Sequence, residues 1–286
     1  MFNHDNTLKK VLTVTDHNRD SGYHYVYPVV SRRAGSVSIG INLNVNNACN
    51  WRCIYCNVPN LTRGKPTPID LVLLEQELRT FLNDILHGNF MQRQVSQSDR
   101  QLQDIAFSGN GEPTSAPEFP CIVPLVIKIL SDVNLLGNIK IRVITNGSLI
   151  NKPSVLASLH QLSYANGEVW FKLDAGTKAG IMRINDVDID PNSHMNRLKQ
   201  CALACPTFIQ TCVFTLDGAP PSVQEIAAYL TRITSVSTVI KGVHLYGVAR
   251  QSMQAEAARV GQVSATWLDD LAAQIAGLGV AVHVSA

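Results

Sequence analysis

The stretch of sequence that decides the fold is SVSIGINLNVNNACNWRCIYCN, which spans residues 36–57. Residues 36–45 are rich in apolar and β-branched side chains, so they predict a β-strand. Directly behind this strand, Cys49, Cys53 and Cys56 follow one another with the spacing C-x3-C-x2-C. In parallel α/β proteins the loops at the carboxyl ends of the strands hold the ligand site. The sequence therefore predicts an α/β fold whose chemistry begins at this first loop.

Downstream of this stretch, short β-rich runs alternate with longer segments of helical periodicity. The alternation predicts a parallel sheet with right-handed crossovers, and its six main repeats fit either an open barrel or a doubly wound sheet. Further strands are predicted at 104–108, 139–145, 168–174, 207–214 and 239–247, with a weaker one at 280–284. Helices are predicted at 68–87, 117–134, 152–161, 192–204, 222–233 and 264–277.

Local signals refine this organisation. Residues 88–103 are polar and predict a mobile loop. Residues 1–35 are polar and irregular apart from an aromatic run at 23–28, so we expect an N-terminal extension there and one domain over 36–286. Capping residues mark three helix starts, which are Pro68 with Asp70, Asn192 with Ser193, and the capping-box pair Ser222 with Glu225.

Composition narrows the class of protein. The chain has 286 residues with a formal net charge of +2, so bulk electrostatics give no argument for nucleic-acid binding. No apolar run of about 18 residues appears, so no membrane span is expected. The N-terminus lacks a secretory signal pattern, and seven cysteines, an odd number, favour metal ligation over a disulfide framework. We expect a cytoplasmic protein.

The cysteine triad suits a metal centre with an open position. Thiolates are soft ligands that favour iron–sulfur clusters and zinc. Three thiolates leave one iron of a [4Fe–4S] cube without a protein ligand, where a cofactor or substrate can bind. The alternatives are a zinc site or three unrelated buried cysteines. Structural zinc normally takes four protein ligands, and no fourth Cys or His lies close by in the sequence.

Polar residues also follow the next three predicted strands. The first such loop contains Gly109, Asn110, Gly111, Glu112 and Pro113, a Gly-rich turn that can approach a ligand closely. Thr145 and Asn146 end the next strand, within a TNG turn. Lys172 and Asp174 end the strand after that and share one of its faces. This pair is either an internal salt bridge or a functional pair facing cofactor or substrate.

Weaker candidates come from the last strands. Polar residues that fit the mouth of a barrel are Gln210, Thr211, Lys241, His244, Tyr246 and Arg250. Arg250 suits a carboxylate of a cofactor or substrate, and Arg183 is a lesser candidate of the same kind. The remaining cysteines are Cys121, which we expect to be a packing residue, and Cys201, Cys205 and Cys212, whose spacing leaves a second cluster open.

Taken together, these motifs resemble the radical S-adenosylmethionine (SAM) superfamily. CNWRCIYC matches its C-x3-C-x-aromatic-C motif, and GNGEP resembles its GGEP motif. The resemblance implies a partial (β/α)6 TIM-like barrel with parallel strands. It also implies a [4Fe–4S] cluster on Cys49, Cys53 and Cys56, with SAM chelated by the free iron. An electron donor such as flavodoxin or ferredoxin is implied as a partner.

The same resemblance assigns roles around SAM. Tyr55 is expected against the adenine, and the loop of Gly109, Asn110, Gly111 and Glu112 against the methionyl amino group. Thr145 and Asn146 are expected at the ribose. The nearest branch is that of the wyosine-forming tRNA enzymes, which share an LDA-type strand end. Those enzymes use a second cluster with N-terminal cysteines, and this chain has no cysteine before Cys49, which argues against wyosine synthesis itself.

Several functions remain open at this point. The leading one is a radical SAM enzyme acting on a small molecule, peptide or nucleotide. Alternatives are an activase that installs a glycyl radical on a partner protein, and a tRNA-modifying enzyme. For the latter, Arg32, Arg33, Arg63 and Lys65 flank the cysteine loop, although a solvated basic rim explains them as well. An electron carrier or a zinc-binding module is the non-enzymatic alternative.

Overall fold

The computed structural model describes residues 11–13, 22–31 and 35–285. An eight-stranded sheet organises this part of the chain, in the order β1-β2-β5-β6-β7-β8-β10-β12. β1 is antiparallel to β2, and every other neighbouring pair is parallel. The strands are β1 (Val26–Ser31), β2 (Ser36–Ile41), β5 (Leu102–Phe107), β6 (Lys140–Thr145), β7 (Gly167–Lys172), β8 (Thr207–Val213), β10 (Gly242–Gly247) and β12 (Val282–Ser285).

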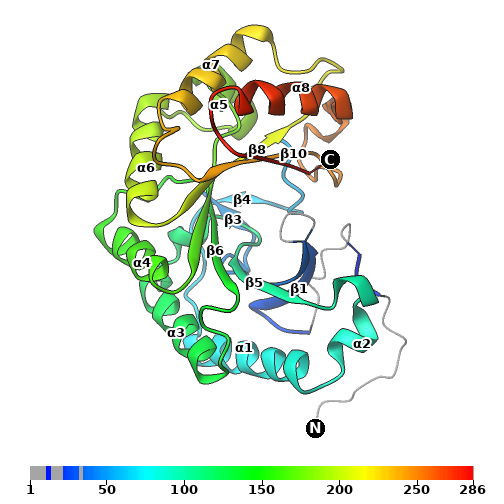
Figure 1. The fold of residues 1–286 in the computed structure, drawn as a ribbon, viewed down its shortest axis with the longest axis vertical. Coiled ribbons are helices and arrows are strands. Elements are labelled where there is room, and N and C mark those ends of the chain that lie inside the picture. Colours follow the sequence, from blue (N-terminus) through cyan, green and yellow to red (C-terminus); the bar gives the residue numbers. More distant parts are fainter. Residues whose placement is uncertain (1–10, 14–21, 32–34, 286) are drawn as a thin grey trace.

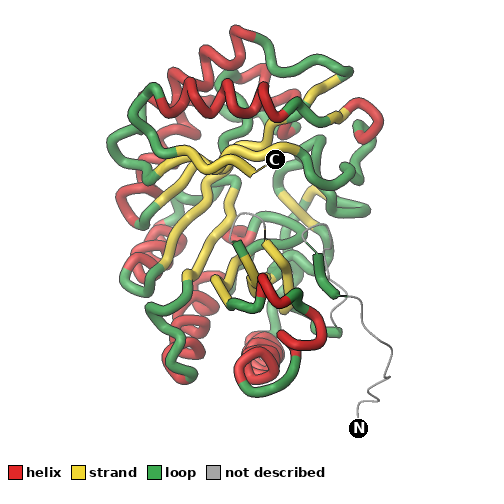
Figure 2. Tube along the Cα trace, turned by 45° about the vertical axis from the view of Figure 1, so that its right-hand side comes forward, coloured by secondary structure: helices red, strands yellow, loops and turns green. Residues whose placement is uncertain are grey.

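The sheet is curled into an open half-barrel, and the large helices form an arc outside the strands (Figure 1). Figure 2 shows the same curvature from the side, with the helices on the outer face. The partial TIM-like barrel expected from the resemblance is therefore confirmed. The α-helices are α1 (Leu71–Leu86), α2 (Phe90–Gln94), α3 (Phe119–Asp132), α4 (Pro153–Ser163), α5 (Lys178–Asn185), α6 (Pro191–Ala204), α7 (Val223–Thr234) and α8 (Ala265–Ala276).

The pleat of the strands separates core from cavity. Ile105, Val143 and Phe171 lie in the middle strands and are fully buried in the core that joins the sheet to its helices. Their neighbours in the sequence point to the concave face, because successive side chains of a strand alternate between faces.

Short elements complete the described part of the chain, namely β3 (Ala48–Cys49), β4 (Thr62–Arg63), β9 (Thr215–Leu216), β11 (Val260–Gly261) and the 3-10 turns Gln97–Asp99, Pro113–Ser115 and Ala257–Arg259.

Local capping explains where two predicted helices begin. The Asp70 side chain accepts hydrogen bonds from the amides of Val72 and Leu73 at the start of α1. Ser222 accepts from the Glu225 amide at the start of α7, as the capping-box pattern predicts. The carboxylate of Glu225 does not complete the box. It accepts instead from the backbone amides of Gly176 and Thr177, which ties α7 to the loop behind β7.

Other predictions about the elements are wrong. Val26–Ser31 was expected to be irregular, yet it forms β1, because its backbone pairs antiparallel with β2 at the edge of the sheet. The loop predicted at 88–103 contains α2, whose Phe90 is buried. The helix expected to start at Asn192 and Ser193 is capped by Asp190 and begins at Pro191. No helix was predicted at α5.

Among the described residues, no helix is long and apolar enough to span a membrane.

Candidate active site

A cavity of about 310 Å³ opens on the concave face of the half-barrel. Pairs of residues two apart in sequence line it from four adjacent strands, in keeping with the pleat. These pairs are Asp104 and Ala106, Arg142 and Ile144, Trp170 and Lys172, and Gln210 and Cys212. Its upper rim is formed by the loops that follow β2, β5 and β6. The cavity therefore lies where a parallel α/β fold places its ligands.

All three cysteines of the triad reach this cavity. None of them is in a disulfide, and each is partly accessible. Burial raises the pKa of Cys49 to about 11 and that of Cys53 to about 12, with Cys56 contributing a repulsion to both. In the described residues no three Cys, His, Asp or Glu side chains are placed to hold a single metal ion.

The cysteine loop is held on three sides by backbone hydrogen bonds. At its start, β3 pairs with β4 in a two-stranded parallel ladder. In its middle, the amides of Arg52 and Ile54 donate to the carbonyls of Asn185 and Ile184 at the end of α5. At its end, the Met253 amide donates to the Cys56 carbonyl. The positions of the thiols are therefore fixed by three distant parts of the chain.

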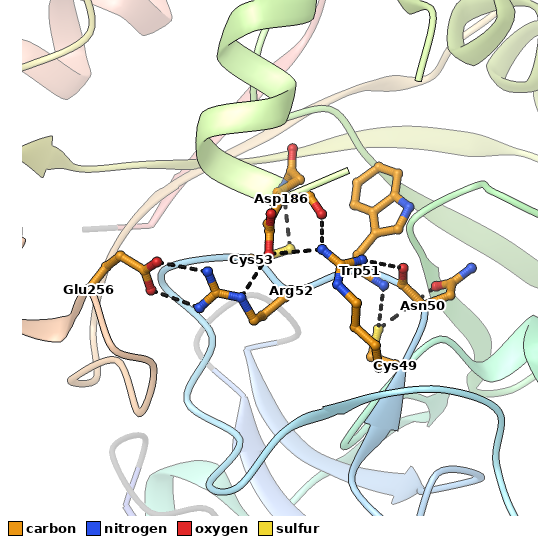
Figure 3. A network of polar contacts seen from close by, with 9 residues as sticks. Cys49, Asn50, Trp51, Arg52, Cys53, Asp186 and Glu256 are labelled. Carbon is orange, nitrogen blue, oxygen red and sulfur yellow. Dashed lines mark hydrogen bonds and ion pairs between the residues drawn. The ribbon is translucent and has the colours of Figure 1, made fainter. Parts of the chain in front are cut away.

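Arg52 adds a charged anchor beneath the loop (Figure 3). Its guanidinium donates to both carboxylate oxygens of Glu256, at 2.8 and 2.9 Å, and to Asp186 at 2.8 Å. Arg63 forms a second ion pair with Asp186 at 2.9 Å. The two carboxylates lower the energy of the charged guanidinium, so the pKa of Arg52 is raised. Arg63 is therefore ion-paired within the fold. Arg32 and Arg33, which the sequence also placed beside the cysteine loop, lie outside the described residues.

The loop after β5 is tied to the loop after β6 by one buried carboxylate. Glu112 accepts from the amide and hydroxyl of Thr114, from the Thr145 hydroxyl at 2.7 Å and from the Asn146 amide at 2.6 Å. Burial raises the pKa of Glu112, and these hydrogen bonds oppose that rise. Oε1 accepts the bonds from Thr114 and Thr145, whereas Oε2 accepts only the bond from Asn146, so the carboxylate ties the two loops together and still lines the cavity.

The glycines of the same loop allow a close approach of two backbones. A Cβ at Gly111 would lie 2.2 Å from the Ala48 carbonyl oxygen, and one at Gly109 would lie 2.6 Å from the Asn42 side chain. Gly109 also has a φ of +133°, which side-chain-bearing residues rarely adopt. Asn110 donates from its side chain to Asn47 at 2.6 Å. The GNGEP segment therefore packs directly against the start of the cysteine loop.

Asn146 connects the strand end of β6 to the first cysteine. Its side-chain amide donates to the Asn50 carbonyl oxygen at 2.8 Å, and Asn50 donates onward to the Ser148 hydroxyl at 2.6 Å. The Trp51 amide points at the Cys49 sulfur, 3.5 Å away. Asn50, Asn146 and the Trp51 amide thus form a polar surrounding for Cys49 at the cavity.

Lys172 and Asp174 form a network with Tyr55 at the end of β7. The Tyr55 hydroxyl donates to Asp174 at 2.7 Å, and the Lys172 ammonium donates to the Tyr55 oxygen at 2.5 Å. The ammonium also lies 3.7 Å from Asp174. Burial alone lowers the pKa of Lys172, but the charge of Asp174 outweighs it and the pKa is raised overall. The predicted salt bridge is present, and Lys172 still lines the cavity.

Asn185 joins this network to the second cysteine. Its side-chain nitrogen donates to an oxygen of Asp174 at 2.8 Å and lies 3.2 Å from the Cys53 sulfur. Sequence reasoning missed Asn185 and singled out its neighbour Arg183, which is exposed on α5. The missed signal was a lone asparagine at the end of a short amphipathic helix. It also missed Ser252 and Gln254, whose side chains donate to the Ile54 and Val58 carbonyls.

The remaining candidates divide into two groups. Gln210, Tyr246 and Arg250 line the cavity, as expected for its mouth. Others do not: Thr211 is bonded to Tyr229 and Leu173 on the opposite face, and Lys241 is exposed at the start of β10. Cys201 and Cys205 lie in the hydrophobic core under α6, whereas Cys212 lines the cavity. The three therefore do not gather into a second cluster. Cys121 is exposed on α3, so its expected packing role is wrong.

Comparison with known proteins adds to this geometry. No protein-family model matches the chain. A curated protein, the GTPase Obg of Brachyspira hyodysenteriae, is 25% identical over 132 residues, which are 46% of this chain and 17% of that protein. Gly64-Lys65 is the only Gly-Lys pair in the sequence and is followed by Pro66, so the phosphate-binding pattern of P-loop GTPases is absent.

Solved structures are similar over most of the chain. A radical SAM methyltransferase from Sphaerobacter thermophilus superposes with a TM-score of 0.57 at 14% identity, covering 87% of this chain and 66% of that one. SuiB of Streptococcus suis, solved with SAM, gives 0.51 at 12% identity, covering 88% and 48%. HydG, a maturase of the [FeFe]-hydrogenase, gives 0.51 at 11%, covering 83% and 48%.

The chain thus spans two thirds or less of the length of each of these proteins. At this level of identity the likeness concerns the fold. The protein therefore has the partial-barrel fold found in radical SAM enzymes, and its cysteine triad lies in the loop that follows β2.

Proposed function

We propose that this protein is a radical SAM enzyme that holds one [4Fe–4S] cluster on Cys49, Cys53 and Cys56. The observation that carries the proposal is that three free thiols share one cavity wall with the GNGEP and TNG loops, at the carboxyl ends of parallel strands. When bound, the cluster supplies the electron that cleaves SAM to a 5′-deoxyadenosyl radical, which takes a hydrogen atom from a substrate.

The donor set fits a cluster better than a single ion. Thiolates are the usual ligands of iron–sulfur clusters, and three of them leave one iron open. A cube keeps its thiolate ligands further apart than one zinc ion does, and the described residues contain no single-ion site. The N–H groups of Asn185 and Trp51 are directed at two of the sulfurs, as suits sulfur atoms that carry negative charge.

The rest of the cavity fits SAM in this proposal. The loop of Gly109, Asn110, Gly111 and Glu112 receives the methionyl amino group, with backbone carbonyls and the Glu112 carboxylate as acceptors. Thr145 and Asn146 hold the ribose end, and Arg250 lies on the cavity wall within reach of a carboxylate. Tyr55 lies against the adenine while its hydroxyl holds Lys172 and Asp174 in place.

Lys172 and Asp174 are the proposed catalytic residues on the substrate side. Lys172 is the ammonium that reaches the cavity from β7, and Asp174 keeps it charged. A cation at this place holds a carbonyl or carboxylate oxygen of a substrate near the hydrogen to be removed. The reductant is proposed to be a flavodoxin or ferredoxin, and the seven free thiols suit a reducing, cytoplasmic location.

The remaining alternatives for the function differ in the class of substrate: a small molecule, tRNA or a partner protein. The branch of the wyosine-forming enzymes remains the nearest proposed kinship, through the strand end that carries Lys172 and Asp174. Arg63, one of the basic residues that flank the cysteine loop, is ion-paired with Asp186, and Lys65 is exposed beside it. We prefer a small-molecule substrate and keep tRNA and a glycyl-radical partner protein as the alternatives.

The test is anaerobic reconstitution with iron and sulfide, followed by reduction in the presence of SAM. We expect about four irons and four sulfides per chain and the formation of 5′-deoxyadenosine. Each of Cys49→Ala, Cys53→Ala and Cys56→Ala should abolish that product, whereas Cys121→Ala, a cysteine exposed on α3, is the matched control. Zinc without inorganic sulfide, or undiminished product in a triad variant, contradicts the proposal.

A further inference from the structure

One buried amide in the cavity has no partner within the protein. Gln210, in the middle of β8, is 1% exposed, and its side-chain nitrogen makes no hydrogen bond to the described residues. No hydrogen bond to its side-chain oxygen is found there either. Gln210 lines the cavity beside Cys212, two residues along the same strand, and faces Lys172 in the register of β7 and β8. A buried polar group that lacks a partner is costly, so its retention points to a ligand.

The charged groups around Gln210 already balance one another. Arg142 forms ion pairs with Asp104 and with Glu168, the latter at 2.6 Å. Lys172 is balanced by Asp174. On the opposite wall, the hydroxyls of Tyr27 and Ser108 bond to each other at 2.9 Å. Gln210 is thus a buried, unpaired amide next to charges that already balance one another, so the ligand atoms that meet it are uncharged.

The chemistry of a carboxamide defines the ligand group further. Gln210 presents one donor and one acceptor side by side, whichever way its amide is turned. A partner that satisfies both must carry N–H and C=O on the same side. Lactams and primary carboxamides do so, whereas a trans peptide bond carries them on opposite sides.

We propose that Gln210 is a specificity-determining residue that pairs with a lactam or primary carboxamide of the substrate. This inference rests on the proposed function, because the upper end of the cavity is assigned there to SAM. The substrate group that pairs with Gln210 lies one strand away from Lys172, at the bottom of the cavity. The end above it is the one assigned to SAM. The substrate class is therefore a small, uncharged lactam or carboxamide rather than a peptide backbone or a polyanion.

The binding test uses the reconstituted holoenzyme with SAM and two matched pairs of probes in calorimetric titrations. Uracil and nicotinamide carry the required unit, whereas 1,3-dimethyluracil and methyl nicotinate lack it. We expect uracil and nicotinamide to bind at least about tenfold more tightly than their partners, the size of one well-placed hydrogen bond. Gln210→Met should remove that preference, and Gln210→Asn should restore part of it.

The outcomes separate the two proposals. If the wild-type enzyme forms 5′-deoxyadenosine but shows no preference within either pair, the role of Gln210 is overturned and the proposed function stands. If the preference is present and depends on Gln210 while no 5′-deoxyadenosine forms, the proposed function is overturned and the recognition of the amide stands. A preference for uracil alone identifies a lactam substrate, and one for nicotinamide alone a primary carboxamide.

Stability gives an independent readout in the substrate-free holoenzyme. Gln210→Met replaces an unpaired amide by an apolar side chain of similar shape, so we expect its melting temperature to equal or exceed that of the wild type. Thr207→Val on the same strand is the matched control, since it removes a buried hydroxyl that does donate, to the Cys205 carbonyl at 2.8 Å. If both variants lower the melting temperature equally, Gln210 is paired within the protein and the inference is wrong.

Discussion

The side-chain nitrogen of Asn185 lies 3.2 Å from the sulfur of Cys53 and 2.8 Å from a carboxylate oxygen of Asp174. One amide therefore links the cysteine loop to the network of Tyr55 and Lys172, across 132 residues of sequence. Hydrogen bonds to the sulfurs of an iron–sulfur cluster stabilise its more negative, reduced form and raise its reduction potential. If the triad holds a cluster as proposed, Asn185 is placed to tune its reduction potential and to align it with the cavity.

Asn185→Ala should make the bound cluster harder to reduce. Loss of one hydrogen bond of about 1 kcal/mol corresponds to about 40 mV for a one-electron step. We therefore expect the midpoint potential to fall by that order, as measured by electron paramagnetic resonance during a redox titration. Asn138→Ala, an exposed asparagine far from the loop, is the control. An unchanged potential in Asn185→Ala contradicts the assigned role.

Gly111→Ala should disrupt the contact between the GNGEP loop and the cysteine loop. The new Cβ meets the Ala48 carbonyl oxygen at 2.2 Å, and such overpacking costs about 1–3 kcal/mol. We expect a lower free energy of unfolding and less iron retained per chain after reconstitution. Gly64→Ala is the matched control, because its Cβ meets only the Ala48 Cβ, at 3.7 Å. Equal iron content in the two variants argues against the close approach.

His194 predicts how stability depends on pH. It is 2% exposed, and its Nε2 donates to the Lys172 carbonyl at 2.9 Å, which requires a proton on Nε2. Burial lowers its pKa from 6.5 to about 4. The unfolded chain then binds more protons between these values, so stability falls as pH falls from 6.5 to 4, by up to about 3 kcal/mol.

The test for His194 is urea unfolding at several pH values between 7 and 4. His194→Gln keeps a hydrogen-bond donor without a titrating ring, so the pH slope of its stability should be flatter than that of the wild type. His160→Gln, which removes an exposed imidazole from α4, is the control for loss of a surface ring. A slope in His194→Gln as steep as that of the wild type means that other groups produce it.

Arg52→Lys should loosen the cysteine loop although the charge is kept. Lysine is a point charge and cannot donate to both oxygens of Glu256 at once, as the guanidinium does. Because these side chains are partly exposed, we expect a loss of about 1 kcal/mol in unfolding experiments. A double-mutant cycle with Glu256→Gln isolates the pair, and a coupling energy of zero shows that the ion pair contributes nothing.

Much of the fold follows from local signals in the sequence. The parallel strands are buried on both faces or end at loops of reactive residues, so their positions stand out, and the starts of α1 and α7 are marked by Asp70 and Ser222. β1 was missed, because its run VYPVVS contains a proline and gains its strand hydrogen bonds only from the edge of β2. The helix at α5 is short and weakly apolar, so periodicity did not reveal it.

Parts of the candidate site could also be predicted from the sequence, and other parts could not. Cysteine spacing and the GNGEP and TNG turns are contiguous motifs, and the structure brings them to one cavity. The roles of single side chains depend on contacts between segments that are far apart in the sequence. Glu112 is a buried tie between two loops, and Asn185 gains its meaning only from a sulfur on another loop. No local pattern contains such information.

The hydrogen bond from Ser252 to the cysteine loop joins two segments that are synthesised far apart in time. Its hydroxyl donates to the Ile54 carbonyl, 198 residues earlier in the chain. This contact can form only once residue 252 has been synthesised, so the loop takes the shape described here when nearly the whole chain is present. A metal centre that needs this shape of the loop is therefore completed at the same late stage.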